Sequence, residues 1–460
     1  MSDFFTEDAA VAVAVEIIPS SSFDDWLADQ PENLANWARS TGFKGKAGTL
    51  SMLPDETGGL AKVLFAVADE PGLWDWAKLP AGLPAGRYRV DGDHGGEAAT
   101  SLALAWALDA YAFKRYKRDA EPSAEKLLVW PDGCDRDAVV AAAAATGLVR
   151  DLINTPASDM GPDGLAAAAE DLARDHGAEI TVVVGDDLLE RNFPAVHAVG
   201  RAHDRAPRLI DLRWGDPAAP KVTLVGKGVC FDTGGLDIKS AAGMKLMKKD
   251  MGGGAHVLGV AKMVMAAALP VRLRVLVPAV ENSIAGNAMR PGDIVATRKG
   301  LSIEINNTDA EGRVILADAL TEAAAETPDL IVDFATLTGA ARVALGTDLP
   351  ALYCNDEALA ADILGAAEAS DDPLWRMPLW AGYEEKVDAK VGDVDNAPEG
   401  GYGGSITAAL FLQRFVADGV PWAHLDLMAW NLSTRAGRPE GGEAMGMRAV
   451  YQMLRNRYGG

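Results

Sequence analysis

Asn307-Thr308-Asp309-Ala310-Glu311-Gly312-Arg313 is the stretch of sequence that decides the fold and chemistry of this chain. Residues 301–306 before it alternate apolar and polar side chains as a strand does, and the Ala/Leu-rich residues 314–326 predict a helix. If extended backbone continues through the junction, Asp309, Glu311 and Arg313 point the same way. Two carboxylates held that close repel each other unless a proton or cation lies between them. Arg313 alone would balance one charge, whereas a divalent metal would balance both.

A second group of carboxylates follows a buried strand expected at residues 221–228. Asp232 precedes Gly234 and Gly235, which permit a turn that residues with a Cβ resist, and Asp250 follows further along the chain. Ligands bind at the carboxyl ends of strands in open α/β sheets. The four carboxylates together supply enough oxygens for two divalent cations, which in two-metal hydrolases lie roughly 3.5–4 Å apart.

Length and the order of elements predict two α/β domains. A chain of 460 residues exceeds one ordinary domain. Residues 1–150 are expected to form a small domain with a role in assembly or regulation, containing strands at 63–67 and 127–130 and helices at 97–116 and 136–153. Asn154-Thr155-Pro156 ends the last of these helices.

Residues 151–460 are expected to form the larger, catalytic α/β domain, a mixed central sheet covered by helices on both faces. Apolar strands alternate here with helices, which are expected at 255–268 and 314–326. The expected strands are 180–184, 208–214, 222–225, 273–277, 303–305, 330–335 and 423–427.

Charge and cysteine content restrict the environment and the partners. A formal net charge of −23 repels phosphate backbones, so nucleic acid is not expected as the main partner. The three cysteines have no metal-type spacing and predict free thiols in a reducing compartment. Cys230 lies near Asp232, which raises the possibility of a functional thiol. The favoured interpretation is a small apolar side chain, or apolar filler, that packs in the loop at the end of the strand. Because the acidic N-terminus is unlike a signal peptide and no apolar stretch is long enough for a bilayer, we expect a cytoplasmic protein without membrane contact.

Two motifs make the chain resemble the leucyl aminopeptidase, or cytosol aminopeptidase, family of two-metal exopeptidases. The signature NTDAEGR is complete at residues 307–313. The upstream pattern G-K-G…F-D-[ST]-G-G…K…D-M is complete at residues 226–228, 231–235, 239 and 250–251. The resemblance covers most of the chain from about residue 148 onward. It rests on motifs in two separate segments, so it is more specific than either motif alone.

The resemblance implies a role for each motif residue. The implied ligands of two metals, with Asp232 and Glu311 bridging, are Lys227, Asp232, Asp250, Asp309 and Glu311. Lys239 would stabilise the oxyanion, and Arg313 would hold a bicarbonate that shuttles protons. The expected substrate-binding residues are Met247, Asn307, Thr336 and Gly339. Without the resemblance, Lys227 would be interpreted as a cation paired with Asp232, and His256 is expected to be a packed helix residue.

The implied reaction is hydrolysis of the N-terminal peptide bond of peptides by a metal-bridging water or hydroxide. Asp250 and one metal would recognise the free α-amine, and Met247 suggests an apolar first residue such as leucine. The oxygen ligands suit Mg²⁺ and Mn²⁺, and the lysine nitrogen also suits Zn²⁺. The resemblance further implies a homohexamer. A two-metal phosphoesterase and a non-catalytic or DNA-binding scaffold are the alternatives that the carboxylates alone leave open.

Overall fold

The computed structural model describes residues 4–118 and 125–459, which divide into two compact units. The first unit contains Met1–Gly147 together with Leu432–Glu440, and the second contains Leu148–Asn431 and Gly441–Gly460. No sequence pattern indicates that Leu432–Glu440 is grouped with the first unit. No helix within the described ranges is long and apolar enough to cross a bilayer.

The first unit is built on a mostly parallel sheet in the order β1-β6-β5-β2-β4-β3, where the edge strand β3 is antiparallel. The strands are β1 (Phe5–Thr6), β2 (Val13–Pro19), β3 (Leu50–Pro54), β4 (Leu60–Val67), β5 (Gly86–Val90) and β6 (Lys126–Val129). The helices are α1 (Phe23–Ala28), α2 (Glu32–Ser40), α3 (Leu73–Trp76), α4 (Lys78–Gly82), α5 (Gly96–Asp109) and the start of α6 (Arg136–Asn154). Trp76, Tyr88 and Trp106 are buried in its core.

One helix of this unit is shorter than the sequence indicated. The helix expected at 97–116 ends at Asp109 as α5. The rings of Phe113 and Tyr116 lie 6.0 Å apart outside the helix. These two aromatic residues pack against each other outside the helix, and the prediction of helix for residues 110–116 was wrong.

The segment Leu432–Glu440 makes its contacts within the first unit. The backbone N–H of Gly437 donates to Asp109 Oδ1 at 3.1 Å, and the Arg438 guanidinium lies 4.2 Å from the centre of the Trp74 ring. The chain leaves and re-enters the second unit through two short antiparallel strands, β19 (Trp430–Asn431) and β20 (Gly441–Gly442).

The second unit contains the mixed central sheet that the sequence predicted. Its order among the described residues is β16-β15-β18-β14-β9-β11-β8-β7, with β10 also paired to β11. β9 is parallel to both of its neighbours, β11 and β14. β8 pairs antiparallel with β11 and with β7, and β15 pairs antiparallel with β18. The strands are β7 (Glu179–Val184), β8 (Arg208–Trp214), β9 (Lys221–Gly226), β10 (Gly228–Asp232), β11 (Arg272–Asn282), β14 (Leu330–Ala335), β15 (Ala351–Cys354), β16 (Trp375–Arg376) and β18 (Trp422–Asp426).

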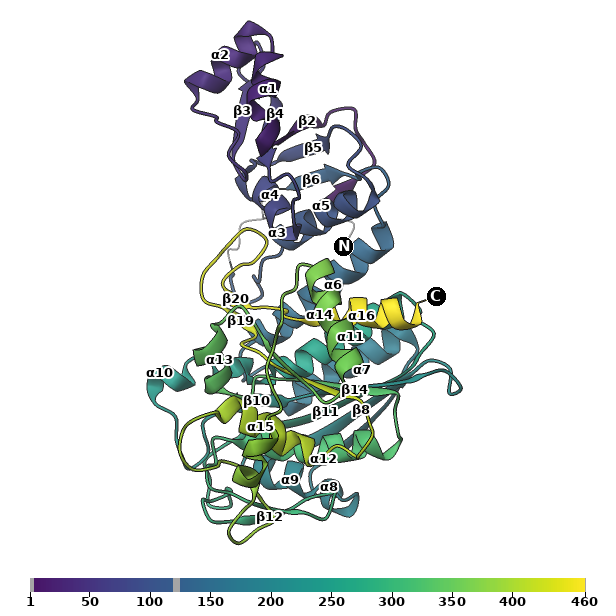
Figure 1. The fold of residues 1–460 in the computed structure, drawn as a ribbon, viewed down its shortest axis with the longest axis vertical. Helices are drawn as coiled ribbons and strands as arrows, with labels where there is room; N and C mark the ends of the chain where they lie inside the picture. Colours follow the sequence, from purple (N-terminus) through teal and green to yellow (C-terminus); the bar gives the residue numbers. More distant parts are fainter. Residues whose placement is uncertain (1–3, 119–124, 460) are drawn as a thin grey trace. The chain divides into compact units, whose positions relative to one another are not determined.

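Helices cover both faces of this sheet, which confirms the α/β fold class (Figure 1). The first face carries α7 (Pro162–His176), α11 (Gly252–Ala266), α14 (Glu357–Ala369) and α16 (Met447–Tyr458). The opposite face carries α9 (Pro194–Gly200), α12 (Glu311–Ala325) and α15 (Gly404–Gln413). Shorter helical segments are α8 (Asp187–Glu190), α10 (Ala241–Met244), α13 (Gly339–Leu345) and the 3-10 turns η3 (Met247–Met251) and η4 (Ala381–Val387).

Glycines allow α11 to begin directly against the sheet. A Cβ on Gly253 would lie 2.0 Å from the carbonyl oxygen of Phe334 in β14 and 2.8 Å from the backbone nitrogen of Lys227. Only glycine permits such a close backbone approach. The start of α11, with Asp250 just before it, is thereby held at the carboxyl ends of β9 and β14.

The junction at the signature differs from the extended backbone considered above. The preceding strand, β13 (Ser302–Glu304), belongs to a separate three-stranded sheet with β12 (Ile294–Ala296) and β17 (Val394–Asp395). The backbone then turns, because the Asn307 side chain accepts a hydrogen bond from the Asp309 N–H at 2.8 Å, and α12 begins at Glu311. The expectation that Asp309, Glu311 and Arg313 share one strand face was therefore wrong.

Candidate metal centre and substrate pocket

Three carboxylates from two distant segments meet at one point. Ligand oxygens of Asp232, Asp309 and Glu311 all lie within 4.8 Å of one another. Asp232 ends β10, Asp309 lies in the turn before α12, and Glu311 is the first residue of that helix. Asp232 and Glu311 are almost completely buried, so their negative charges face each other away from water.

Two lysines lie among these carboxylates. Lys227 Nζ is 2.7 Å from Asp250 Oδ2 and 3.1 Å from Glu311 Oε1, and it donates to the carbonyl oxygen of Thr336 at 2.9 Å. Lys239 Nζ is 2.7 Å from Asp232 Oδ2 and is also paired with Asp309. The residues alone suggested that Lys227 pairs with Asp232. In the structure Lys239 pairs with Asp232, and Lys227 pairs with Asp250 and Glu311.

The electrostatics of the cluster follow from burial and mutual repulsion. Burial, together with the charges of Glu311 and Asp250, raises the pKa of Asp232 well above its usual value. Burial raises the pKa of Glu311 as well. Burial would lower the pKa of Lys227, but Asp250 and Glu311 outweigh this effect and raise it. Metal ligation requires Lys227 to be a neutral amine. Only a more highly charged cation among the same carboxylates, such as a divalent metal, would lower its pKa enough for that.

The carboxylates are oriented by residues that the sequence did not single out. Asn282, at the end of β11, donates from Nδ2 to Asp232 Oδ1 at 2.8 Å and to the carbonyl oxygen of Thr308 at 3.0 Å. Thr308 Oγ1 donates to the carbonyl oxygen of Gly234 at 2.6 Å. Asn396 Oδ1 accepts the backbone N–H of Asn307 at 3.2 Å. These bonds tie the loop after β10 to the signature, and no local pattern marks Asn282 or Asn396 beforehand.

Arg313 and Asn307 lie beside the centre and are not part of the cavity wall. The Arg313 guanidinium is buried and donates from Nη1 to the carbonyl oxygen of Asn396 at 2.7 Å, while its Nε has no hydrogen-bond partner among the described residues. Burial lowers the pKa of Arg313 to about 10, which leaves it charged at neutral pH. The Asn307 side-chain oxygen is engaged in the turn before α12.

A cavity of about 350 Å³ opens over the centre. Its wall includes Met247 of η3, Thr336 after β14 and Gly339 at the start of α13, three residues expected to contact the substrate. Thr336 Oγ1 also donates to Asp250 Oδ1 at 2.8 Å, so it links the wall to a carboxylate of the cluster.

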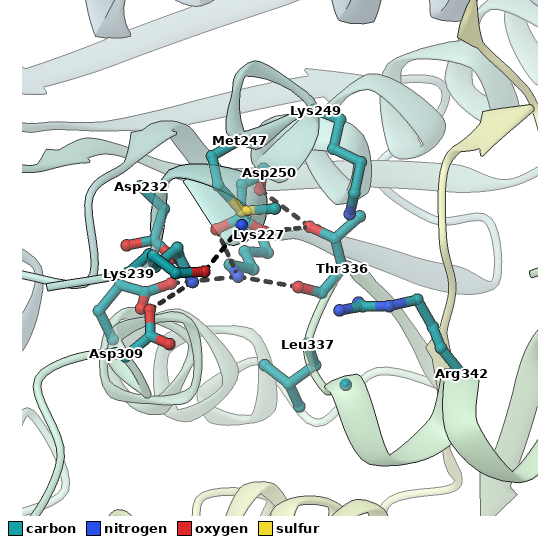
Figure 2. A pocket seen from close by; sticks show the side chains of 14 residues that line it. Lys227, Asp232, Lys239, Met247, Lys249, Asp250, Asp309, Thr336, Leu337 and Arg342 are labelled. Carbon is teal, nitrogen blue, oxygen red and sulfur yellow. Dashed lines mark hydrogen bonds and ion pairs between the residues drawn. The ribbon is translucent and has the colours of Figure 1, made fainter. Parts of the chain in front are cut away.

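Two cations that the sequence analysis missed also line this cavity. Figure 2 shows Asp232 and Asp309 on one side of the pocket and Lys249 and Arg342 on the other. Lys249 is 1% exposed, and burial, reinforced by the charges of Arg342 and Lys227, lowers its pKa to about 7. A carboxylate bound beside it would favour the charged form again. In the charged run Lys248-Lys249-Asp250, no sequence pattern distinguishes a lysine that lines a pocket from one on the surface.

Cys230 and His256 are buried outside the cavity. Burial raises the pKa of the Cys230 thiol well above its usual value, which fits the apolar filler expected for it. His256 Nε2 accepts the backbone N–H of Met445 at 2.8 Å, and its Nδ1 lies 2.6 Å from the carbonyl oxygen of Gly252. Both ring nitrogens are therefore engaged with the backbone, as a packed helix residue requires.

The residues present fit a metal centre. Asp250 Oδ2, Asp309 Oδ1 and Glu311 Oε2 are buried oxygens that accept no well-aligned hydrogen bond from any described residue, although ammonium groups approach the first two closely. Buried carboxylate oxygens without a donor are costly unless a cation is bound to them. All the donors are oxygens except Lys227, a set that suits Mn²⁺, Mg²⁺ or Zn²⁺.

Comparisons with known proteins agree with this geometry. The family model described as "Cytosol aminopeptidase family, catalytic domain" matches residues 147–451, and "M17 aminopeptidase, N-terminal domain" matches residues 13–130. A probable cytosol aminopeptidase of Rhizobium meliloti is 38% identical over 464 residues, covering 94% of this chain and 93% of that protein.

Solved structures are similar over nearly the whole chain. The crystal structure of a cytosol aminopeptidase from Coxiella burnetii has a TM-score of 0.95 and 48% identity, covering 100% of both chains. The bottromycin maturation enzyme BotP in complex with Mn has a TM-score of 0.87 and 35% identity, covering 97% of this chain and 100% of that one.

Proposed function

The chain belongs to the cytosol aminopeptidase family, and on that premise we propose that it removes the N-terminal residue of peptides with two divalent metal ions held at the carboxylate cluster. It is a hydrolase of the aminopeptidase class, and the family is metal-dependent. Family membership favours an aminopeptidase over the two alternatives, a two-metal phosphoesterase and a non-catalytic scaffold, as the main function. The convergence of Asp232, Asp309 and Glu311 within 4.8 Å supports the metal proposal most directly.

The proposed metal ligands are the residues that surround the cluster. They are Lys227, Asp232, Asp250, Asp309 and Glu311, which would together hold the ions. When bound, the two ions would polarise the scissile carbonyl and supply an activated water at neutral pH. Zinc and manganese are both proposed, and the structure of the similar BotP with Mn supports manganese.

The remaining polar residues would bind and orient the peptide. The Asp250 carboxylate lies at the inner wall of the cavity, where it would take part in holding the free α-amine. Lys239 lines the same cavity beside Asp232 and Asp309, so its ammonium would stabilise negative charge that develops on the carbonyl oxygen. Arg313 has an Nε without a partner among the described residues, which supports a small planar anion such as bicarbonate beside it.

Met247 and Thr336 would form the wall that contacts the first side chain, and Met247 favours an apolar residue such as leucine. Asn307 would act by holding the turn before α12, since its side chain bonds to the Asp309 backbone. We also propose a homohexamer of cytoplasmic location, in which the first unit takes part in assembly. Light scattering on the purified protein tests the hexamer.

The test of the proposed function compares leucine p-nitroanilide with its N-acetyl derivative, before and after chelation. We expect cleavage of the free compound only, loss of activity on exhaustive chelation, and recovery with Mn²⁺ or Zn²⁺. An acylated nitrogen has delocalised its lone pair, so it cannot take the place of the amine at the metal. Equal rates on both compounds would show a general amidase, and full turnover by verified metal-free protein would refute the metal proposal.

A further inference from the structure

The cavity holds two cations that the proposed mechanism does not use, Lys249 and Arg342. The Lys249 side chain is 1% exposed yet belongs to the cavity wall, and the half-buried Arg342 lines the same cavity. Neither side chain makes a hydrogen bond or ion pair with another residue in the described ranges 4–118 and 125–459. A buried charge without a partner is costly, so Lys249 calls for an anion from outside the chain, and the half-buried Arg342 would contact the same anion.

The two carboxylates whose charges act on Lys249, Asp250 and Asp426, are already engaged. Asp250 is paired with Lys227 at 2.7 Å and accepts from Thr336 at 2.8 Å. Asp426 accepts the backbone N–H of Leu337 at 3.0 Å and the hydroxyl of Thr338 at 2.6 Å. Lys249 and Arg342 meanwhile repel each other. A bound anion would relieve that repulsion and gain two charge-assisted contacts.

The position of the two cations identifies which part of a substrate would carry the anion. Lys249 follows Met247 by two residues on η3, and Arg342 follows Gly339 by three residues on α13. Met247 belongs to the proposed wall for the first side chain, and Gly339 lines the same cavity and was expected to bind substrate. Figure 2 draws both cations on the side of the pocket opposite Asp232 and Asp309. The end of the first side chain, rather than the scissile bond, would therefore face them.

We propose that this subsite accepts acidic first residues, with the side-chain carboxylate of an N-terminal glutamate bound between Lys249 and Arg342. The inference rests on the proposed aminopeptidase function and adds a second substrate class to the apolar one. The methylene groups of glutamate would lie along Met247, and the planar fork of Arg342 matches a carboxylate in two hydrogen bonds. The same charges would disfavour N-terminal lysine and arginine.

The experiment compares glutamyl and glutaminyl p-nitroanilides, which differ in the side-chain charge and hardly in shape. A hydrogen bond to a charged group is worth enough that we expect kcat/KM to favour glutamate by at least about tenfold. Lys249→Met and Arg342→Met should each reduce that ratio. The matched control, Lys245→Met, changes an exposed lysine of the same segment that does not line the cavity, and should keep it.

A binding measurement makes the test independent of turnover. Titration calorimetry of the full chain with free L-glutamate and L-glutamine should show tighter binding of glutamate, and the difference should shrink in Arg342→Met even if Lys249→Met fails to fold. Metal content is measured in each variant, because a merely structural role of Lys249 beside Asp250 would change it, whereas side-chain recognition would not.

The outcomes separate this inference from the proposed function. Cleavage of leucine p-nitroanilide with no preference for glutamate over glutamine, in rate or in binding, would overturn the inference and leave the aminopeptidase intact. Glutamate binding without cleavage of any anilide would support the subsite and refute the function. The anilides lack a C-terminal carboxylate, so if only peptides with a free C-terminus show a charge preference, the anion belongs to the far end of the peptide and the inference is wrong.

Discussion

Replacing Gly312 with alanine should disable the metal centre while the protein stays folded. Gly312 is the second residue of α12, and an added Cβ would lie 2.5 Å from Cε and 2.8 Å from Nζ of Lys227. Carbon atoms normally approach to about 3.5–4.0 Å, so the tip of Lys227 must move by roughly 1 Å. The displaced amine can no longer hold its 2.7 Å and 3.1 Å contacts to Asp250 and Glu311.

The substitution should affect the free energy of unfolding and the metal affinity to different extents. Alanine is favoured over glycine inside a helix by roughly 0.5–1 kcal/mol, which offsets part of the strain of moving Lys227. Groups that orient metal ligands typically contribute about 10- to 100-fold to metal affinity when mutated, and Lys227 is itself a proposed ligand, so we expect a loss of at least that size. Unfolding in urea should therefore change little, while metal binding falls steeply.

The assay is a metal titration against a competing chelator, with elemental analysis of the purified protein and leucine p-nitroanilide hydrolysis alongside. Gly365→Ala is the matched control, because Gly365 lies inside α14 with nothing within 4 Å of the added Cβ. It should gain slight stability and keep its metal. Wild-type metal affinity in Gly312→Ala would refute the view that the missing Cβ positions the Lys227 amine.

Three further predictions concern the centre and the core. Asp309→Asn and Glu311→Gln should each lower bound metal in elemental analysis; unchanged stoichiometry would exclude them as ligands. Lys239→Ala should retain metal and lose rate by about 10²- to 10³-fold, the usual effect of removing an oxyanion donor, so normal turnover would disprove its role. Burial lowers the pKa of His256 from 6.5 to about 4. Its contribution to stability is therefore complete above pH 6.5 and lost as pH falls toward 4, a change of roughly 3 kcal/mol that urea unfolding should show in the wild type and not in His256→Gln.

The alternation of apolar strands and helices predicted the fold class, and two motifs taken together predicted the convergence of the carboxylates. Strands β8 and β14 were predicted at their observed bounds, and the turn after Asp232 at Gly234 and Gly235 has the positive φ angles of 88° and 64° that its glycines allow. The signature's geometry was missed, because a side-chain hydrogen bond from the Asp309 backbone to Asn307 competes with extended backbone.

Residues that act through long-range contacts were not predictable in the same way. Asn282 and Asn396 reach the centre from the ends of strands far away in sequence, where single asparagines are common and carry no signal. Lys249 sits in a charged run that is typical of a solvated surface, and only packing shows that its side chain is buried in the pocket. Burial of a charge is a tertiary property, so no local pattern marks it in advance.

The excursion of Leu432–Glu440 into the first unit makes the two units inseparable by a single cut. A fragment that begins at Leu148 would keep this segment but lose Asp109 and Trp74, the groups that Gly437 and Arg438 contact. Exchange of the first unit between relatives, by recombination or by engineering, would have to transfer two stretches of gene at once. The N-terminal unit is therefore expected to be inherited together with its catalytic partner rather than shuffled as an independent module.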